Sequence, residues 1–167
     1  MVMMTDDRAA DWVAAARRLP PGNLVVVRAR DTAKRRRLAA ALKGLARLLI
    51  ADDPDLASEI GAAGLHLPEK RMREAAHWRA RHPDWIITSS AHSLRALLDA
   101  RHLDAVFVSP VFATASHARA RPLTPLRAAF IAAHAPVPAY ALGGVDGRNA
   151  ALLAPAFSGI AGIGLFL

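Results

Sequence analysis

Residues 48–68 read LLIADDPDLASEIGAAGLHLP, and this stretch contains one complete strand–helix–strand unit. Its two apolar runs, Leu48–Ile50 and Gly64–Leu67, are short and continuous, which is typical of parallel strands buried on both faces. Between them, Asp53 followed by Pro54 predicts the start of a helix, because aspartate caps a first turn and proline is tolerated in it. The unit therefore predicts an α/β fold with a parallel sheet.

The same rhythm continues along the whole chain. Further apolar runs that predict strands are Val2–Met4, Leu24–Val27, Trp85–Thr88, Ala105–Val108, Pro138–Leu142 and Ser158–Ile163. Helical patterns lie between them, such as the stripe Leu94, Leu97 and Leu98 and the helix start at Thr124-Pro125. Eight strands spaced about 20 residues apart fit a (β/α)8 barrel better than an open doubly wound sheet of roughly five or six strands.

The length of the chain limits how many helices this barrel can have. With 167 residues the chain is short for the fold, and after the last predicted strand no residues remain for an eighth helix. No linker or low-complexity stretch marks a domain boundary. We therefore expect a compact, trimmed (β/α)8 TIM barrel that lacks the last helix and forms a single domain over residues 1–167.

Composition and charge exclude several classes of protein. The chain has no cysteine, which excludes disulfide scaffolds and cysteine-ligated metal sites. The formal net charge of +8 favours anionic partners, and small phosphorylated substrates fit better than nucleic acid, because aromatic residues are only 5% of the chain. Neither a signal peptide nor a run of about 20 apolar residues is present, so we expect a cytoplasmic protein without a membrane partner. The sequence leaves homo-oligomerisation open.

The loops after the first predicted strands carry charged candidates, because barrel active sites lie in such loops. Arg28 and Arg30 occupy alternate positions of an extended segment, a spacing suited to gripping a diphosphate; the alternative is solvated charge leading into the run 34–37. Asp52 could hold a hard cation such as Mg²⁺. The neighbouring Asp53 is better explained as the helix cap.

The middle loops carry candidates for proton transfer. His66 is either an acid/base residue or a hydrogen-bonded core histidine. Ser90 lies two residues before His92, although a serine here could instead cap a helix starting near Ala91. The long segment 109–122 is expected to be a binding loop or lid, and its candidates are Thr114, Ser116 and His117.

The last two loops are rich in glycine. Gly143 and Gly144 follow the seventh predicted strand and precede a helix expected near Gly147, while Gly162 and Gly164 close the eighth. Glycine lets backbone N–H groups approach a ligand, and the loops after strands seven and eight of such barrels frequently bind phosphate. The alternative is that these glycines only permit tight turns.

Several of these segments together resemble the thiamine-phosphate synthase and TenI family of small (β/α)8 barrels. The resemblance runs from Met4 to about residue 165 and is carried by residues 48–52 (Leu-Leu-Ile-Ala-Asp), 64–68 (Gly-Leu-His-Leu-Pro), 90–93 (Ser-Ala-His-Ser), 109–114 (Ser-Pro-Val-Phe-Ala-Thr) and 141–145 (Ala-Leu-Gly-Gly-Val). The synthase of this family joins a hydroxymethylpyrimidine diphosphate to a thiazole phosphate and releases pyrophosphate with the help of Mg²⁺. We therefore expect thiamine-phosphate synthase activity.

The resemblance also implies roles for individual residues. Arg28 and Arg30 match the pair that holds the diphosphate, and Asp52 matches a Mg²⁺ ligand. The implied catalytic residues are Ser90, Thr114, Ser116 and His117, the last standing where the family has lysine. The implied contacts of the thiazole phosphate are Gly143, Gly144, Gly162 and Ile163, with Gly162-Ile163 standing where the family has Ile-Ser.

Departures from the family pattern limit these expectations. Val26 and Ala51 replace a glutamine and an asparagine, and the second Mg²⁺ carboxylate is expected where the chain has Pro68-Glu69-Lys70-Arg71. Mg²⁺ is therefore expected to bind weakly and only with diphosphate. The TenI-type tautomerase needs a histidine where the chain has Ser109-Pro110. The alternatives to synthase activity are a catalytically degenerate phosphate-ligand binding or regulatory protein, and a TenI-like thiazole tautomerase.

Overall fold

Eight parallel strands form a closed barrel in the computed structural model, which describes residues 1–7, 11–114, 121–153 and 155–163. Each strand pairs with the next one along the chain, and β8 pairs with β1 to close the ring. The strands are β1 (Val2–Met4), β2 (Leu24–Val27), β3 (Arg47–Ala51), β4 (Gly64–Leu67), β5 (Ile86–Ala91), β6 (Ala105–Val108), β7 (Ala139–Leu142) and β8 (Gly159–Gly162). The predicted (β/α)8 barrel is confirmed.

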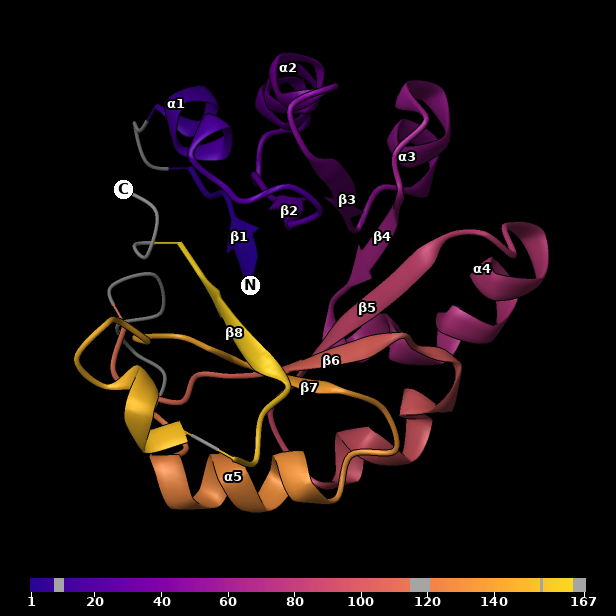
Figure 1. The fold of residues 1–167 in the computed structure, drawn as a ribbon. Coiled ribbons are helices and arrows are strands. Elements are labelled where there is room, and N and C mark those ends of the chain that lie inside the picture. The colour runs from indigo at the N-terminus through magenta and orange to yellow at the C-terminus, as the bar shows by residue number, and fades with distance from the viewer. Residues whose placement is uncertain (8–10, 115–120, 154, 164–167) are drawn as a thin grey trace.

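Helical segments surround this ring of strands (Figure 1). The α-helices are α1 (Trp12–Arg17), α2 (Thr32–Leu42), α3 (Pro54–Ile60), α4 (Ala75–Arg81) and α5 (Pro125–Ala133), and the 3-10 helices are η1 (Glu69–Glu74), η2 (Arg95–His102) and η4 (Ala150–Leu153). Within the described ranges, no helix combines the length and the apolar character needed to cross a bilayer. Residues 164–167 lie outside the described part of the chain, so the predicted lack of a last helix stays a prediction.

Aspartate side chains start the first three α-helices. Asp53 accepts a hydrogen bond from the backbone N–H of Leu56 at 3.1 Å, as its position before Pro54 predicts. Asp11 and Asp31 cap α1 and α2 in the same way. Thr124 precedes α5 as predicted, but its side chain makes no capping hydrogen bond. These caps satisfy N–H groups that a helix leaves unpaired at its first turn.

The core has an inner part inside the barrel and an outer part under the helices. Alternate residues of each strand face opposite sides of a sheet. Met3, Val25 and Ile50 accordingly pack with Trp12 and Leu42 of the helices. The inner cluster contains Val2, Met4, Val26, Leu49, Ala51, Phe107 and Ala161. Both faces of the strands are therefore buried, as their continuous apolar runs predict.

Strand β5 extends further than its apolar run predicts. It runs to Ala91, so Ser89 and Ser90 belong to the strand and not to the loop after it. The predicted serine cap of a helix near Ala91 is wrong. Ser93 lies at the turn instead, where its hydroxyl accepts from the N–H of Ala96 at 3.3 Å. Pairing with β6 holds these two serines in the sheet, where Ser89 is fully buried and Ser90 is partly exposed.

Two segments predicted to be helical in the second half of the chain are 3-10 helices in the structure. Leu97 and Leu98 of the predicted stripe lie in the 3-10 helix η2, and Leu94 directly precedes it; only Leu97 is buried, and Leu98 is 72% exposed. The 3-10 helix has about 3.0 residues per turn, so a stripe with α-helical spacing does not stay on one face. The helix expected near Gly147 begins only at Ala150, as the four-residue 3-10 helix η4, after a turn over 147–149.

The glycine pair after β7 packs against the loop after β6. Gly144 has a φ of +65°, in the left-handed region. A Cβ on Gly144 would lie 2.3 Å from the carbonyl oxygen of Ala113 and 2.8 Å from the Cβ of Phe112. Both the conformation and the close approach therefore require glycine.

Replacing Gly144 by alanine should lower the free energy of unfolding by about 2 kcal/mol or more, because the new Cβ adds backbone strain and displaces a backbone oxygen. Gly147→Ala is the matched control: a Cβ there meets nothing within 4 Å. It should change stability by no more than about 0.5 kcal/mol. Urea denaturation of both variants measures the difference, and equal effects would contradict this explanation.

Candidate active site

A cavity of about 990 Å³ opens at the end of the barrel where the strands finish. Its wall receives residues from the end of each strand or the loop that follows, as the fold requires of an active site. The polar and charged lining residues are Asp6, Asp7, Arg28, Arg30, Arg35, Asp52, His66, Glu69, Ser90, His92, Ser109, Thr114 and Arg121. Acidic and basic groups thus share one rim around a barrel interior that carries hydroxyl and imidazole groups.

Most predicted site residues within the described ranges reach this cavity. Those that line it are Arg28, Arg30, Asp52, Ser90, Thr114, Gly143 and Ile163. Two do not line it: Gly144 packs on the loop after β6, and Gly162 is buried in the β8–β1 ladder opposite Met3. Ser116, His117 and Gly164 lie outside the described residues.

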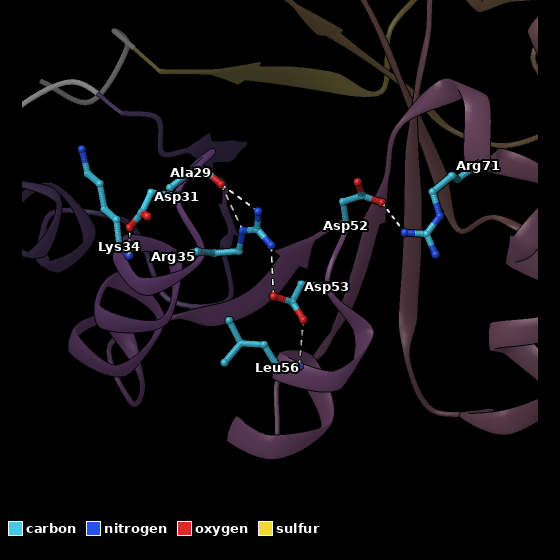
Figure 2. A network of polar contacts seen from close by, with 8 residues as sticks. All are labelled: Ala29, Asp31, Lys34, Arg35, Asp52, Asp53, Leu56 and Arg71. Carbon is cyan, nitrogen blue, oxygen red and sulfur yellow. Dashed lines mark hydrogen bonds and ion pairs between the residues drawn. The ribbon is translucent and has the colours of Figure 1, made fainter.

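Three arginines line this cavity with guanidinium groups that are not paired with any described residue. The side chains of Arg28, Arg30 and Arg121 form no hydrogen bond or ion pair with other residues in the described ranges. Arg35, in contrast, donates to the carbonyl of Ala29 and to Asp53 (Figure 2). Free guanidinium groups are suited to binding phosphate oxygens in a bidentate manner.

The backbone that carries two of these arginines is fixed from β1. The hydroxyl of Thr5 donates to the carbonyl of Arg28 at 3.0 Å and accepts from its N–H at 2.9 Å. Asp7 accepts from the N–H of Arg30 at 3.1 Å. Thr5 and Asp7 are not among the site residues predicted from the sequence, which start in the loop after the second strand. Their place directly after the first strand is the signal that could have found them.

His66 lies inside the barrel beneath the rim. Its Nδ1 is 2.9 Å from the hydroxyl of Thr88 and its Nε2 is 3.2 Å from that of Ser90, and the ring stacks on Phe107 with centroids 5.0 Å apart. Burial, and then the nearby charge of Arg28, lower the pKa of His66 to about 3. It is therefore a neutral, hydrogen-bonded residue near pH 7 that also lines the cavity.

His92 is held in one tautomer at the end of β5. Its Nδ1 lies 2.6 Å from the carbonyl oxygen of Ser109, and since a carbonyl only accepts, Nδ1 carries the proton. Nε2 makes no hydrogen bond to the described parts of the chain. In the neutral ring this nitrogen is a base, and its residue lines the cavity.

The oxygen donors at Asp52 do not fit a resident Mg²⁺ ion. Asp52 accepts from Nη1 of Arg71 at 2.5 Å (Figure 2), and Asp53 is committed to Leu56 and Arg35. Glu69 accepts from the N–H of His92. No group of three or more metal-ligating side chains occurs among the described residues. Mg²⁺ normally keeps several oxygen ligands, and one carboxylate already paired with arginine is insufficient.

The positions of Gly143 and Gly144 support only part of the phosphate site that the sequence predicts for them. Gly143 reaches the cavity wall, but the helix expected to follow it is absent from residues 147–149. Asn149 instead donates to the carbonyl of Gly144 at 2.8 Å. An anion bound beside Gly143 would contact backbone N–H groups of the loop and would not be stabilised by the dipole of a long helix.

Comparison with known proteins assigns the chain to a family. A sequence profile described as thiamine monophosphate synthase matches residues 2–166. The chain belongs to the thiamine monophosphate synthase family. It is 35% identical over 132 residues to a putative thiamine-phosphate synthase 2 of Aquifex aeolicus, covering 77% of this chain and 70% of the relative.

Two further comparisons agree with this membership. The thiamine-phosphate synthase of a Synechocystis species is 32% identical over 106 residues, which are 62% of this chain but only 31% of that protein. The solved thiamine phosphate pyrophosphorylase of Pyrococcus furiosus superposes with a TM-score of 0.76 at 21% identity, covering 97% of this chain and 84% of the other. At that identity the structural likeness shows the fold alone.

The pKa of His66 predicts a pH dependence of stability. The unfolded chain protonates this histidine below its ordinary pKa of 6.5, whereas the folded chain does so only near 3. Its contribution to stability is therefore complete above pH 6.5 and is lost as pH falls toward 3. The stability difference between wild type and His66→Asn should shrink by about 1.4 kcal/mol per pH unit below pH 6. Denaturant titrations at several pH values measure it, and a constant difference would show that His66 titrates normally.

Proposed function

We propose that this chain is a thiamine-phosphate synthase that joins hydroxymethylpyrimidine diphosphate to thiazole phosphate. The bond between the pyrimidine methylene carbon and the diphosphate oxygen breaks, pyrophosphate leaves with the electron pair, and the thiazole nitrogen forms the new bond to that carbon. The carrying observation is that the guanidinium groups of Arg28, Arg30 and Arg121 lie on the wall of one cavity and have no hydrogen-bond or ion-pair partner among the described residues. Membership of the family supports the choice of substrates.

Charge stabilisation is the main task of the site in this reaction. A departing diphosphate accumulates negative charge, and guanidinium groups fixed beforehand stabilise that charge without reorganising. Thr5 and Asp7 fix the backbone of Arg28 and Arg30, which supports such a role. Ser90 and Thr114 supply hydroxyl groups along the same wall. In this proposal Mg²⁺ binds only together with the diphosphate, because the carboxylate oxygens at Asp52 are not sufficient to bind the ion by themselves.

Proton transfer on a phosphorylated thiazole is the second candidate function. The observation that favours it is His92, whose Nδ1 is bound to the Ser109 carbonyl so that Nε2 is left as a base beside the cavity. A histidine oriented in this way can remove a proton from one ring position and return it to another. This activity would be TenI-like, with the base supplied by the end of β5.

An assay with both substrates separates the candidates. Purified protein with hydroxymethylpyrimidine diphosphate, thiazole phosphate and Mg²⁺ should form thiamine phosphate and pyrophosphate in equal amounts. Deuterium exchange into thiazole phosphate alone, lost in His92→Gln, would instead support the tautomerase. Binding of both ligands without either reaction would establish a degenerate binding or regulatory protein and overturn the synthase proposal.

The rim arginines should contribute to affinity and not to stability. Arg28→Ala and Arg30→Ala should each weaken binding of pyrophosphate roughly 10- to 150-fold, which corresponds to about 1.5 to 3 kcal/mol for a hydrogen bond to a charged group. Their unfolding free energy should change by no more than about 0.5 kcal/mol, because their guanidinium groups have no partner within the described ranges. Calorimetry and urea denaturation measure the two quantities.

Arg37→Ala is the matched control for this prediction. Arg37 is an exposed residue of α2 outside the cavity lining, and its substitution removes the same charge. It should leave pyrophosphate affinity unchanged. If Arg37→Ala weakens binding as much as Arg28→Ala does, the anion binds the outer surface of α2 and the proposed site is wrong.

A further inference from the structure

A chain of three charged side chains lies beside the cavity, where the loop after β3 meets η1. Nη1 of Arg71 donates to Asp52, while its Nε and Nη2 donate to the two oxygens of Glu74 at 2.7 and 2.6 Å. The arginine thus uses both edges of its guanidinium group, binding Glu74 with one and Asp52 with the other.

The backbone fixes the position of the Asp52 carboxylate in this arrangement. Asp52 has a φ of +57°, a left-handed conformation that aspartate tolerates better than most residues. Its N–H donates to the carbonyl of His66 at 2.9 Å, so β4 holds the residue at the end of β3. Arg71 approaches from η1, the segment that directly follows β4 (Figure 2). The ion pair therefore links two neighbouring βα loops.

We propose that the guanidinium group of Arg71 takes the place of a divalent cation at Asp52, so that the carboxylates of these two loops form no resident metal site. A cation that bridges carboxylates from two loops would neutralise their charge and tie the loops together. Arg71 does both here, with a side chain that never dissociates. Glu69, a further carboxylate of the same 3-10 helix that lines the cavity, accepts from the N–H of His92.

The pairing of Asp52 with Arg71 determines which charged groups a bound diphosphate would meet in the proposed synthase. With the Asp52 carboxylate paired to Arg71, the protein groups among the described residues that offer unpaired positive charge to a diphosphate are the three rim arginines. The inference rests on the proposed function for the identity of the ligand. Its test does not, since metal binding can be measured without substrates and without turnover.

Exchanging the arginine for a carboxylate should create the metal site that the wild type lacks. Arg71→Asp leaves Asp52 and Glu74 without their cation and adds a third oxygen donor beside them. Titration calorimetry with Mg²⁺ or Mn²⁺ in the absence of phosphate should show at least about tenfold tighter binding than in the wild type. Thermal denaturation should show a metal-dependent rise in Tm in the variant only.

Three further variants keep this test decisive. Arg73→Asp makes the same charge change in the same 3-10 helix, but its side chain is 83% exposed and paired with Asp99, so it should gain no affinity. Asp52→Asn combined with Arg71→Asp should lose the gain. Arg71→Gln, which frees the carboxylates without adding one, should gain by a smaller factor and serves if Arg71→Asp does not fold.

The contrary outcomes are equally clear. Tight Mg²⁺ binding by the wild type that Asp52→Asn abolishes would overturn the inference, because Arg71 would then coexist with a resident metal. An equal gain in Arg73→Asp would overturn it as well, since the effect would be one of net charge. Failure to form thiamine phosphate would reject the proposed synthase and leave the metal titration unaffected.

Discussion

Closure of the parallel barrel by pairing of β1 with β8 is the constraint on which the rest of the structure depends. The two strands meet at Val2↔Ala161 and Met3↔Gly162, and this short ladder removes both free edges of the sheet. It also brings the carboxyl ends of all strands to one rim, so residues as distant in sequence as Asp7 and Ile163 line the same cavity. A rim made from many loops can combine opposite charges in a small space, as the neighbouring arginines and aspartates do here.

The distribution of hydrogen bonds among these charged groups determines what the rim can bind. Acidic groups are largely engaged within the protein: Asp52 by Arg71, Asp53 by Arg35 and Glu69 by a backbone N–H. Several basic groups have no partner within the described ranges. An anion therefore finds donors that need not be released from other contacts, whereas a hard cation finds carboxylates that already have a counter-charge. This asymmetry supports the proposed preference for phosphorylated ligands over free metal ions.

Sequence patterns were sufficient to predict the barrel, and they place the candidate site in the loops after the strands, where the cavity lies. They were insufficient to predict the contacts among the residues of that candidate site. The buried strands are continuous apolar runs, so their order and approximate bounds could be predicted; β5 was the exception because its last residues are serines. The roles of Ser90 and Asp52 could not be predicted, since each depends on a partner that only the closed barrel brings near: His66 for the serine and Arg71 for the aspartate. The 3-10 form of η2 was also missed, because Leu94, Leu97 and Leu98 have the spacing of an α-helix.

The two hydrogen bonds between Thr5 and the backbone of Arg28 have a consequence for the energetics of recognition. They link residues that are 23 positions apart, so the chain conformation that presents this cation is established when β1 joins β2. Part of the conformational entropy of the loop after β2 is therefore lost on folding, and less remains to be lost when a ligand binds. The assembly of the barrel therefore preorganises the backbone of this rim arginine, which supports the proposed binding of an anion.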